Sequence, residues 1–217
     1  TAGLRRRARV QEKIEKLSAA DTLRAIRFAN VVVLVLDATA PAERQDLTIA
    51  GHVIDEGRAP LIALNKWDLV EDRTATLAAL RDRLESSLPQ AHGIPVVTLS
   101  AMTGDGVDRL MPAVVGAYER WNKRIGTGPL NRWLGDAVDR HPPPLVEGRR
   151  LRLRYGTQIK ARPPTIVLFS SQPSALPEAY RRYLVNSLRE TFGLDGVPIR
   201  IMLRKGKNPY ADADDGK

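Results

Sequence analysis

The stretch that decides the fold is Pro60-Leu61-Ile62-Ala63-Leu64-Asn65-Lys66-Trp67-Asp68, an apolar run that ends in a short polar segment. Two similar apolar runs occupy residues 31–37 and 95–99. Continuous runs rich in Val, Ile and Leu are typical of strands buried on both faces of a parallel sheet. Helical periodicity marks the segments around them, at residues 10–28, 45–56, 74–88 and 106–121. This alternation predicts an α/β domain whose parallel sheet is wrapped by helices.

Polar residues directly follow two of the predicted strands, as Asn65-Lys66-Trp67-Asp68 and as Ser100-Ala101-Met102. Ligands of such sheets bind at the carboxyl ends of the strands. An Asn-Lys-x-Asp segment there is how GTP-binding domains read guanine. A plain polar turn is the alternative interpretation, but the strand context and the later Ser-Ala pair favour the guanine site.

Each residue of this site has an expected task. The Asp68 carboxylate would accept the N1–H and N2–H protons of guanine, which adenine does not offer, so adenine would leave a buried carboxylate unpaired. Lys66 would lie over the base, and Asn65 would tie neighbouring loops together. Backbone N–H groups of Ser100, Ala101 and Met102 would donate to guanine O6. For Trp67 we favour packing over base stacking.

The phosphate-binding half of such a domain is not found in the sequence. No G-x-x-x-x-G-K-[ST] segment occurs, and the chain begins with Thr1-Ala2-Gly3, which looks like the end of a D-T-A-G motif. In P-loop GTPases the Asp of that motif holds Mg²⁺ through water, and the Gly N–H, here that of Gly3, contacts the γ-phosphate. We therefore expect a fragment, or a sequence that omits earlier residues, with most Mg²⁺ ligands outside it.

Composition excludes several classes of protein. The 217 residues contain no cysteine, so disulfides and thiolate metal sites are excluded. The three histidines, His52, His92 and His141, have no metal-binding spacing, and we expect no metal site. No apolar run approaches the ~20 residues of a membrane helix, and no signal-peptide pattern is present. We expect a cytoplasmic protein that does not bind membranes.

Charge divides the chain into two unlike parts. Residues 1–125 contain 18 Lys and Arg against 16 Asp and Glu, whereas residues 126–217 contain 16 against 9. Gly126-Thr127-Gly128-Pro129 between them is a hinge signal. We therefore predict two domains, 1–125 and 126–217, of which the second is basic enough to bind nucleic acid.

The second part has the pattern of a small α+β module. Helical periodicity marks residues 129–139 and 177–192, and strand patterns mark residues 149–160, 165–169 and 197–204. The predicted order is α-β-β-α-β, with both helices on one face of a three-stranded sheet. Alternation along residues 149–160 places Leu151, Leu153 and Tyr155 on the apolar face.

Arginines are predicted on the opposite face of that sheet. The five positions are Arg150, Arg152, Arg154, Arg200 and Arg204. Repulsion among like charges is relieved by an anionic partner, which is either RNA or an acidic surface of another domain of the same protein. We give the two equal weight, because no aromatic residue is expected among these arginines to stack on bases.

Four segments together resemble one family. They are Thr1-Ala2-Gly3-Leu4-Arg5-Arg6, Asn65-Lys66-Trp67-Asp68-Leu69-Val70, Ser100-Ala101 and Arg204-Lys205-Gly206-Lys207-Asn208-Pro209-Tyr210. The combination is similar to the Der, or EngA, family of bacterial GTPases, which have two consecutive Era-like G domains and a C-terminal KH-like domain. The resemblance implies the second G domain from switch II onward, followed by the KH-like domain.

The same resemblance implies a function. It implies GTP binding and hydrolysis with Mg²⁺ and K⁺, in assembly of the large ribosomal subunit, with rRNA and the first G domain as partners and no DNA. Leu4 occupies the position at which Ras-like proteins have the Gln that orients water, and a leucine offers no hydrogen bond. Slow intrinsic hydrolysis is therefore expected.

One departure keeps another class of function open. Residues 126–217 contain no G-x-x-G, the segment with which ordinary KH domains clamp nucleic acid. RNA contact would then depend on the basic surface alone. The alternative is a non-hydrolysing RNA-binding or scaffold fragment, which the lack of a P-loop supports.

Overall fold

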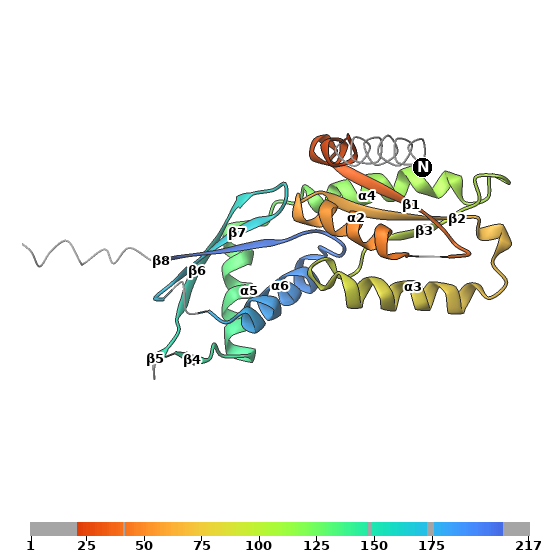
Figure 1. Ribbon diagram of the computed structural model, residues 1–217. Coiled ribbons are helices and arrows are strands. Elements are labelled where there is room, and N and C mark those ends of the chain that lie inside the picture. Colours follow the sequence, from red (N-terminus) through yellow and green to blue (C-terminus); the bar gives the residue numbers. More distant parts are fainter. Residues whose placement is uncertain (1–20, 41, 147–148, 173–175, 206–217) are drawn as a thin grey trace, which may run out of the picture. The chain divides into compact units, whose positions relative to one another are not determined.

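A computed structural model describes residues 21–40, 42–146, 149–172 and 176–205. The chain divides into two compact units between Tyr118 and Glu119, inside a helix (Figure 1). We still propose that the hinge itself lies near Gly126, where one helix has ended and the next begins. Within the described ranges, no helix is long and apolar enough to cross a membrane.

The three predicted strands of the first unit form one parallel sheet (Figure 1). They are β1 (Val31–Asp37), β2 (Ala59–Asn65) and β3 (Val96–Thr98), in the order β1-β2-β3. The first six residues of β2 are all buried, as expected for a central strand covered on both faces. The predicted α/β class is confirmed.

A helix at residues 21–28 precedes β1, and one helix follows each strand, as predicted. The three that follow strands are α2 (Arg44–Asp55), α3 (Arg73–Ser87) and α4 (Leu110–Trp121). The 3-10 helices are η1 (Trp67–Leu69), η2 (Pro89–Ala91) and η3 (Val107–Arg109). The helix predicted from residue 106 therefore begins as a 3-10 turn. The part of the predicted first helix before residue 21 lies outside the described residues.

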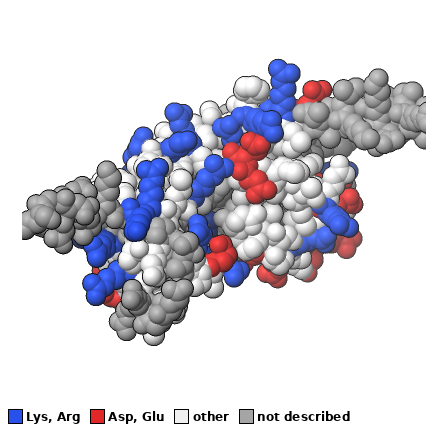
Figure 2. Space-filling view, turned by 60° about the vertical axis from the view of Figure 1, so that its left-hand side comes forward, with Lys and Arg blue, Asp and Glu red and all other residues white. Residues whose placement is uncertain are grey.

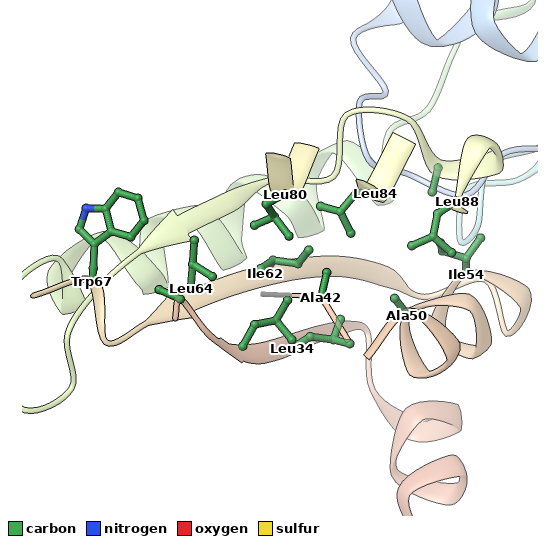
Figure 3. Close-up of a cluster of buried hydrophobic side chains, with 13 residues drawn as sticks. Leu34, Ala42, Ala50, Ile54, Ile62, Leu64, Trp67, Leu80, Leu84 and Leu88 are labelled. Carbon is green, nitrogen blue, oxygen red and sulfur yellow. The ribbon is translucent and has the colours of Figure 1, made fainter. Parts of the chain in front are cut away.

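Alternate residues of β2 enter two different cores. Ile62 and Leu64 belong to a cluster with Leu80 and Leu84 of α3 (Figure 3), whereas Leu61 and others pack on the opposite face. That second cluster contains Leu61, Ala63, Val97, Leu99 and Ala117. Fully burying each leucine contributes about 1.5–3 kcal/mol relative to leaving it exposed. The two cores fix the sheet, and with it the strand ends that carry the polar residues.

The turn after β3 requires glycine at one position. Gly106 has a φ of 73°, in the left-handed region that side chains disfavour. A Cβ there would collide with the backbone oxygen of Thr98 and the side chain of Arg109. This turn brings the chain from Ser100 back towards the sheet, because the Ser100 N–H donates to the Asp105 oxygen at 2.9 Å.

The second unit contains a three-stranded sheet with two long helices. Its elements are α5 (Thr127–Arg140), β6 (Leu153–Lys160), β7 (Thr165–Ser170), α6 (Glu178–Phe192) and β8 (Arg200–Lys205). The sheet order is β6-β7-β8, with β6 antiparallel and β8 parallel to β7. This is the predicted α-β-β-α-β order.

One predicted strand, residues 149–160, is wrong as a single element. Its first residues form β5 (Arg149–Arg150), which pairs with β4 (Leu145–Val146) in a separate two-stranded sheet. Residues 151 and 152 then connect β5 to β6. The periodicity of residues 149–160 predicts an extended chain, but it does not show that residues 149–150 pair with β4 and residues 153–160 with β7.

Asn131 of α5 fixes the outer edge of β6. Its Oδ1 accepts the Gly156 N–H at 2.8 Å, and its Nδ2 donates to the Gly156 oxygen at 2.9 Å. A Cβ on Gly156 would lie 2.9 Å from a methyl carbon of Leu168 and 3.6 Å from one of Leu130. The face of the sheet that carries Gly156 and Leu168 is therefore the one packed on α5, which leaves the opposite face for other contacts.

Candidate functional site

The carboxyl ends of the parallel strands bring the predicted polar residues together. In the register of the sheet, Asp37 at the end of β1 pairs with Asn65 at the end of β2, and Leu64 pairs with Thr98 of β3. Backbone hydrogen bonds continue this alignment into the loops, since the Trp67 N–H donates to the Leu99 oxygen at 3.1 Å. The loops after β2 and β3 are thus held side by side.

Asn65 connects these two loops, as the sequence predicted. Its Oδ1 accepts the Ala101 N–H at 2.9 Å, while its backbone oxygen accepts the Ala38 N–H at 2.8 Å. One residue therefore bonds to the segments that follow β1 and β3. Loss of the Asn65 amide would free the Ser100-Ala101 loop.

Lys66 is held in an unusual conformation. Its φ of 62° lies in the left-handed region, one of two such positions among described non-glycine residues. Its ammonium lies 2.5 Å from Oδ2 of Asp37, whose Oδ1 accepts the N–H and hydroxyl of Thr39 at 2.9 and 2.7 Å. Strained backbone of this kind persists where surrounding contacts fix it, and it is frequent at binding sites.

Asp37 is a site residue that the sequence reasoning missed. The hydrogen bond from Lys66, followed by those from Thr39, lowers the pKa of the Asp37 carboxyl to about 2. Its carboxylate is therefore ionised throughout the neutral range and keeps the Lys66 ammonium in place. The sequence feature that could have identified Asp37 is its position at the end of the predicted strand 31–37, since ligands bind at the carboxyl ends of such strands.

Asp68 differs from Asp37 in having no partner. Its side chain is exposed, and among the described residues it makes no hydrogen bond and no ion pair. Trp67 beside it is only 6% exposed and packs in the core shown in Figure 3, with the Arg73 guanidinium 5.8 Å from its ring centre. The packing interpretation of Trp67 is confirmed, and this anchor leaves the Asp68 carboxylate facing outward.

The loop after β3 offers fewer free donors than predicted. The Ser100 N–H donates to the Asp105 oxygen, and the Ala101 N–H donates to Asn65. Met102 is 93% exposed, and its N–H has no hydrogen bond within the described part of the chain. Of the three predicted donors to guanine O6, Met102 is the one whose N–H is not already bonded.

Two other predicted site residues, Gly3 and Leu4, lie outside the described residues. Within the described ranges, no group of three or more His, Cys, Asp and Glu residues could hold a metal ion.

The predicted arginine face is only partly correct. Arg154, Arg200 and Arg204 are exposed on β6 and β8, but Arg152 lies in the connection before β6, where its backbone pairs with Ser171. The side chain of Arg150, on β5, lies outside what the structure describes. The arginines thus come from two sheets, because residues 149–160 form two strands.

Tyr155 is a second correction. The register shifts between Leu153 and Tyr155, so that Tyr155 pairs with Phe169 and is 44% exposed. A bulge of this kind reverses the alternation that placed it on the apolar face. The register also places an aromatic residue beside one of the predicted arginines, because Phe169 pairs in turn with Arg204.

Comparisons with known proteins match the two units of the chain to two different families. Residues 19–120 match the family described as the elongation factor Tu GTP binding domain. Residues 124–204 match the KH-domain-like family of EngA bacterial GTPase enzymes, C-terminal.

Among curated proteins, GTPase Der of Parvibaculum lavamentivorans is 59% identical over 98% of this chain and 45% of its own length. GTPase Der of Brucella melitensis biotype 2 is 58% identical over 97% of this chain and 44% of its own. A solved structure of a probable GTP-binding protein engB has 20% identity and a TM-score of 0.41 over 51% of this chain and 68% of that one. At that score the likeness supports no inference.

The fold and the motif define the class of protein first. A parallel sheet with flanking helices and an Asn-Lys-x-Asp segment, followed by a KH-like module, is the arrangement of a protein with a GTP-binding-type domain and a KH-like domain. The chain belongs to the Der (EngA) family of GTPases. It spans about half the length of the curated relatives it matches.

Proposed function

We propose that the first unit binds the base of a guanine nucleotide through Asn65, Lys66 and Asp68, together with the Ser100-Ala101-Met102 loop. The observation that carries this proposal is the Asp68 carboxylate, which is exposed and has no partner among the described residues, beside a Lys66 that Asp37 already holds. A carboxylate in this position accepts the two N–H groups of guanine. Adenine presents no such pair of donors, so it leaves the carboxylate unsatisfied.

The wider function follows from family membership. As part of a longer protein, the chain binds and hydrolyses GTP in the bacterial cytoplasm during assembly of the large ribosomal subunit, with rRNA and another G domain as partners. The relatives' name, GTPase Der, supports the nucleotide part of this proposal. Gly3 and Leu4 lie outside the described residues, so the proposal assigns no hydrolytic step to a residue of this chain.

Base preference tests the guanine proposal. In a protein of the relatives' full length that contains this chain, GDP should bind at least about a hundredfold more tightly than ADP, because a bound base covers the exposed Asp68 carboxylate and adenine would leave it desolvated without a donor. Calorimetric titration with both nucleotides measures the ratio. Equal affinities would contradict the proposal, and no binding of either, with RNA binding retained, would favour the alternative of a non-hydrolysing RNA-binding or scaffold fragment.

We also propose that the basic side of the second unit binds RNA phosphates, with an acidic surface of another domain as the alternative. Replacing Arg150, Arg152 and Arg154 with alanine should lower the salt dependence of RNA binding. For single strands, the slope against the logarithm of salt concentration falls by about 0.7 per lost phosphate contact. Fluorescence anisotropy of labelled RNA with the 217-residue chain, at several salt concentrations, measures the slope.

A matched control removes charge elsewhere. Arg44 on α2 and Arg81 and Arg83 on α3 are exposed in the first unit, and replacing all three with alanine should leave the slope unchanged. Identical slopes for the triple variant and the unmodified chain would rule out phosphate contact by these arginines. That result would leave contact with another domain as their function.

A further inference from the structure

The bulge in β6 creates a pair of aromatic rings on the sheet face that does not pack on α5. The ring centres of Tyr155 and Phe169 lie 5.9 Å apart, at an angle of 42° between the planes. Tyr155 is 44% exposed, while Phe169 beside it on the central strand is half-buried. The pair therefore presents one supported, partly exposed aromatic surface.

The hydroxyl of Tyr155 distinguishes it from the other described tyrosines of this unit. Tyr180 donates to the His141 oxygen at 2.6 Å, and Tyr183 donates to the Ala137 oxygen at 2.8 Å. Both are thereby fixed to α5 and the residue that follows it. The Tyr155 hydroxyl has no hydrogen bond within the described residues. Hydrogen bonding within the described residues thus explains the position of the Tyr180 and Tyr183 hydroxyls but not that of the Tyr155 hydroxyl.

The strands around this pair carry charge of one sign. Strands β6, β7 and β8 contain no Asp or Glu, and their basic residues are Arg154, Lys160, Arg200, Arg204 and Lys205. The register places Arg204 opposite Phe169, in the same cross-strand row as the aromatic pair, whereas Arg200 lies opposite Thr165 at the other end of the strand. Figure 2 shows blue side chains over the second unit, at the left, with uncharged surface between them.

A partner for this face must satisfy both the cations and the aromatic surface. An acidic protein surface would satisfy the arginines but would offer nothing specific to an exposed tyrosine ring. Unpaired nucleotides offer both, because their phosphates attract arginine and their base faces stack on aromatic rings. Duplex RNA keeps its base faces inside the helix, so it would use the arginines alone.

We propose that Tyr155, supported by Phe169, stacks on an unpaired RNA base while Arg204 and its basic neighbours contact the adjoining phosphates. This inference rests on the RNA binding proposed above and specifies its ligand as single-stranded RNA. It also gives the unit a way to bind RNA without the G-x-x-G segment, which residues 126–217 lack.

The test compares single-stranded and duplex RNA of equal length and sequence, bound to the 217-residue chain. Tyr155→Ala should weaken binding of the single strand by between about fivefold and a hundredfold, the range for one lost base stack. Tyr155→Phe keeps the ring and should retain the affinity of the unmodified chain. Duplex binding should not change in either variant.

Salt dependence separates stacking from phosphate contact. Tyr155→Ala removes no charge, so its salt slope should equal that of the unmodified chain. Arg204→Ala should instead lower the slope by about 0.7 on single-stranded RNA. As a control for loss of an exposed aromatic ring, Phe28→Ala, at a position 80% exposed in the first unit, should change neither affinity nor slope.

The outcomes distinguish base stacking by Tyr155 from RNA binding by the second unit as a whole. Unchanged single-strand affinity for Tyr155→Ala, with a lowered slope for Arg204→Ala, would overturn base stacking and leave phosphate binding intact. A chain that binds neither RNA, or whose slope is unaffected by any arginine, would overturn RNA binding itself. Equal losses on duplex and single strand would assign Tyr155 to the structure of the face rather than to a base.

Discussion

Replacing Asp68 with asparagine should convert the guanine site into a xanthine site. The asparagine amide would present an N–H₂ group to the N1–H and N2–H edge of guanine, so donors would face donors. Xanthine has a carbonyl at C2, which accepts from that amide. We expect GTP affinity to fall by at least about a hundredfold while XTP affinity rises, since a site with an unmatched buried polar group rejects its ligand strongly.

The measurement is a competition titration of GTP against XTP in a protein of the relatives' full length that contains this chain. Asp105→Asn is the matched control, because Asp105 is exposed in the neighbouring loop and contributes its backbone groups, not its carboxylate, to hydrogen bonds there. The control should bind GTP as the unmodified protein does. Unchanged GTP affinity in Asp68→Asn would show that Asp68 does not read the base.

The strands of the first unit were predictable because each is a buried apolar run. The predicted strand at residues 31–37 is β1 to the residue, and β2 extends the predicted run by one residue at each end. A central parallel strand needs apolar side chains on both faces, so its sequence has no competing interpretation. The expectation that Asn65 ties neighbouring loops together came from the Asn-Lys-x-Asp pattern, and its Oδ1 accepts the Ala101 N–H.

What could not be predicted depends on contacts between distant residues. Asp37 is recognisable as part of the site only once β1 is known to pair with β2. Tyr155 fits a regular alternation along β6 until the pairing with β7 shifts at that residue. Strand periodicity predicts that successive side chains lie on opposite faces of the sheet, but the pairing with the partner strand determines where a bulge interrupts that alternation.

In the core of the second unit, Trp133 also makes contacts with distant residues that could not be predicted from the sequence, and its replacement should have a large effect on stability. Trp133 is one of the buried residues of α5 and is 3% exposed. Its Nε1 donates to the Ser187 hydroxyl at 3.1 Å, and Phe192 meets its ring edge-on at 6.4 Å. Both partners lie on α6, so Trp133 joins the two helices through contacts that the sequence does not reveal.

Trp133→Ala should therefore destabilise the second unit by about 3–5 kcal/mol, the range for removing a buried aromatic side chain and leaving a cavity. Trp133→Phe keeps most of the volume and leaves the buried Ser187 hydroxyl without its donor, which costs about 1–3 kcal/mol. Hydrogen exchange measured by mass spectrometry should show faster exchange in peptides from α5 and α6, while peptides from β1 and β2 keep their protection.

Leu145→Ala is the matched control for loss of apolar volume. Leu145 is 65% exposed in the same unit, so its replacement should change stability by less than about 0.5 kcal/mol. Ser187→Ala adds a second test, because it removes the acceptor of the Trp133 hydrogen bond. Combining it with Trp133→Phe should lower the free energy of unfolding little more than either change alone, since both remove the same bond. Equal exchange in the Trp133→Ala and Leu145→Ala proteins would contradict the assignment of Trp133 as the residue that joins α5 to α6.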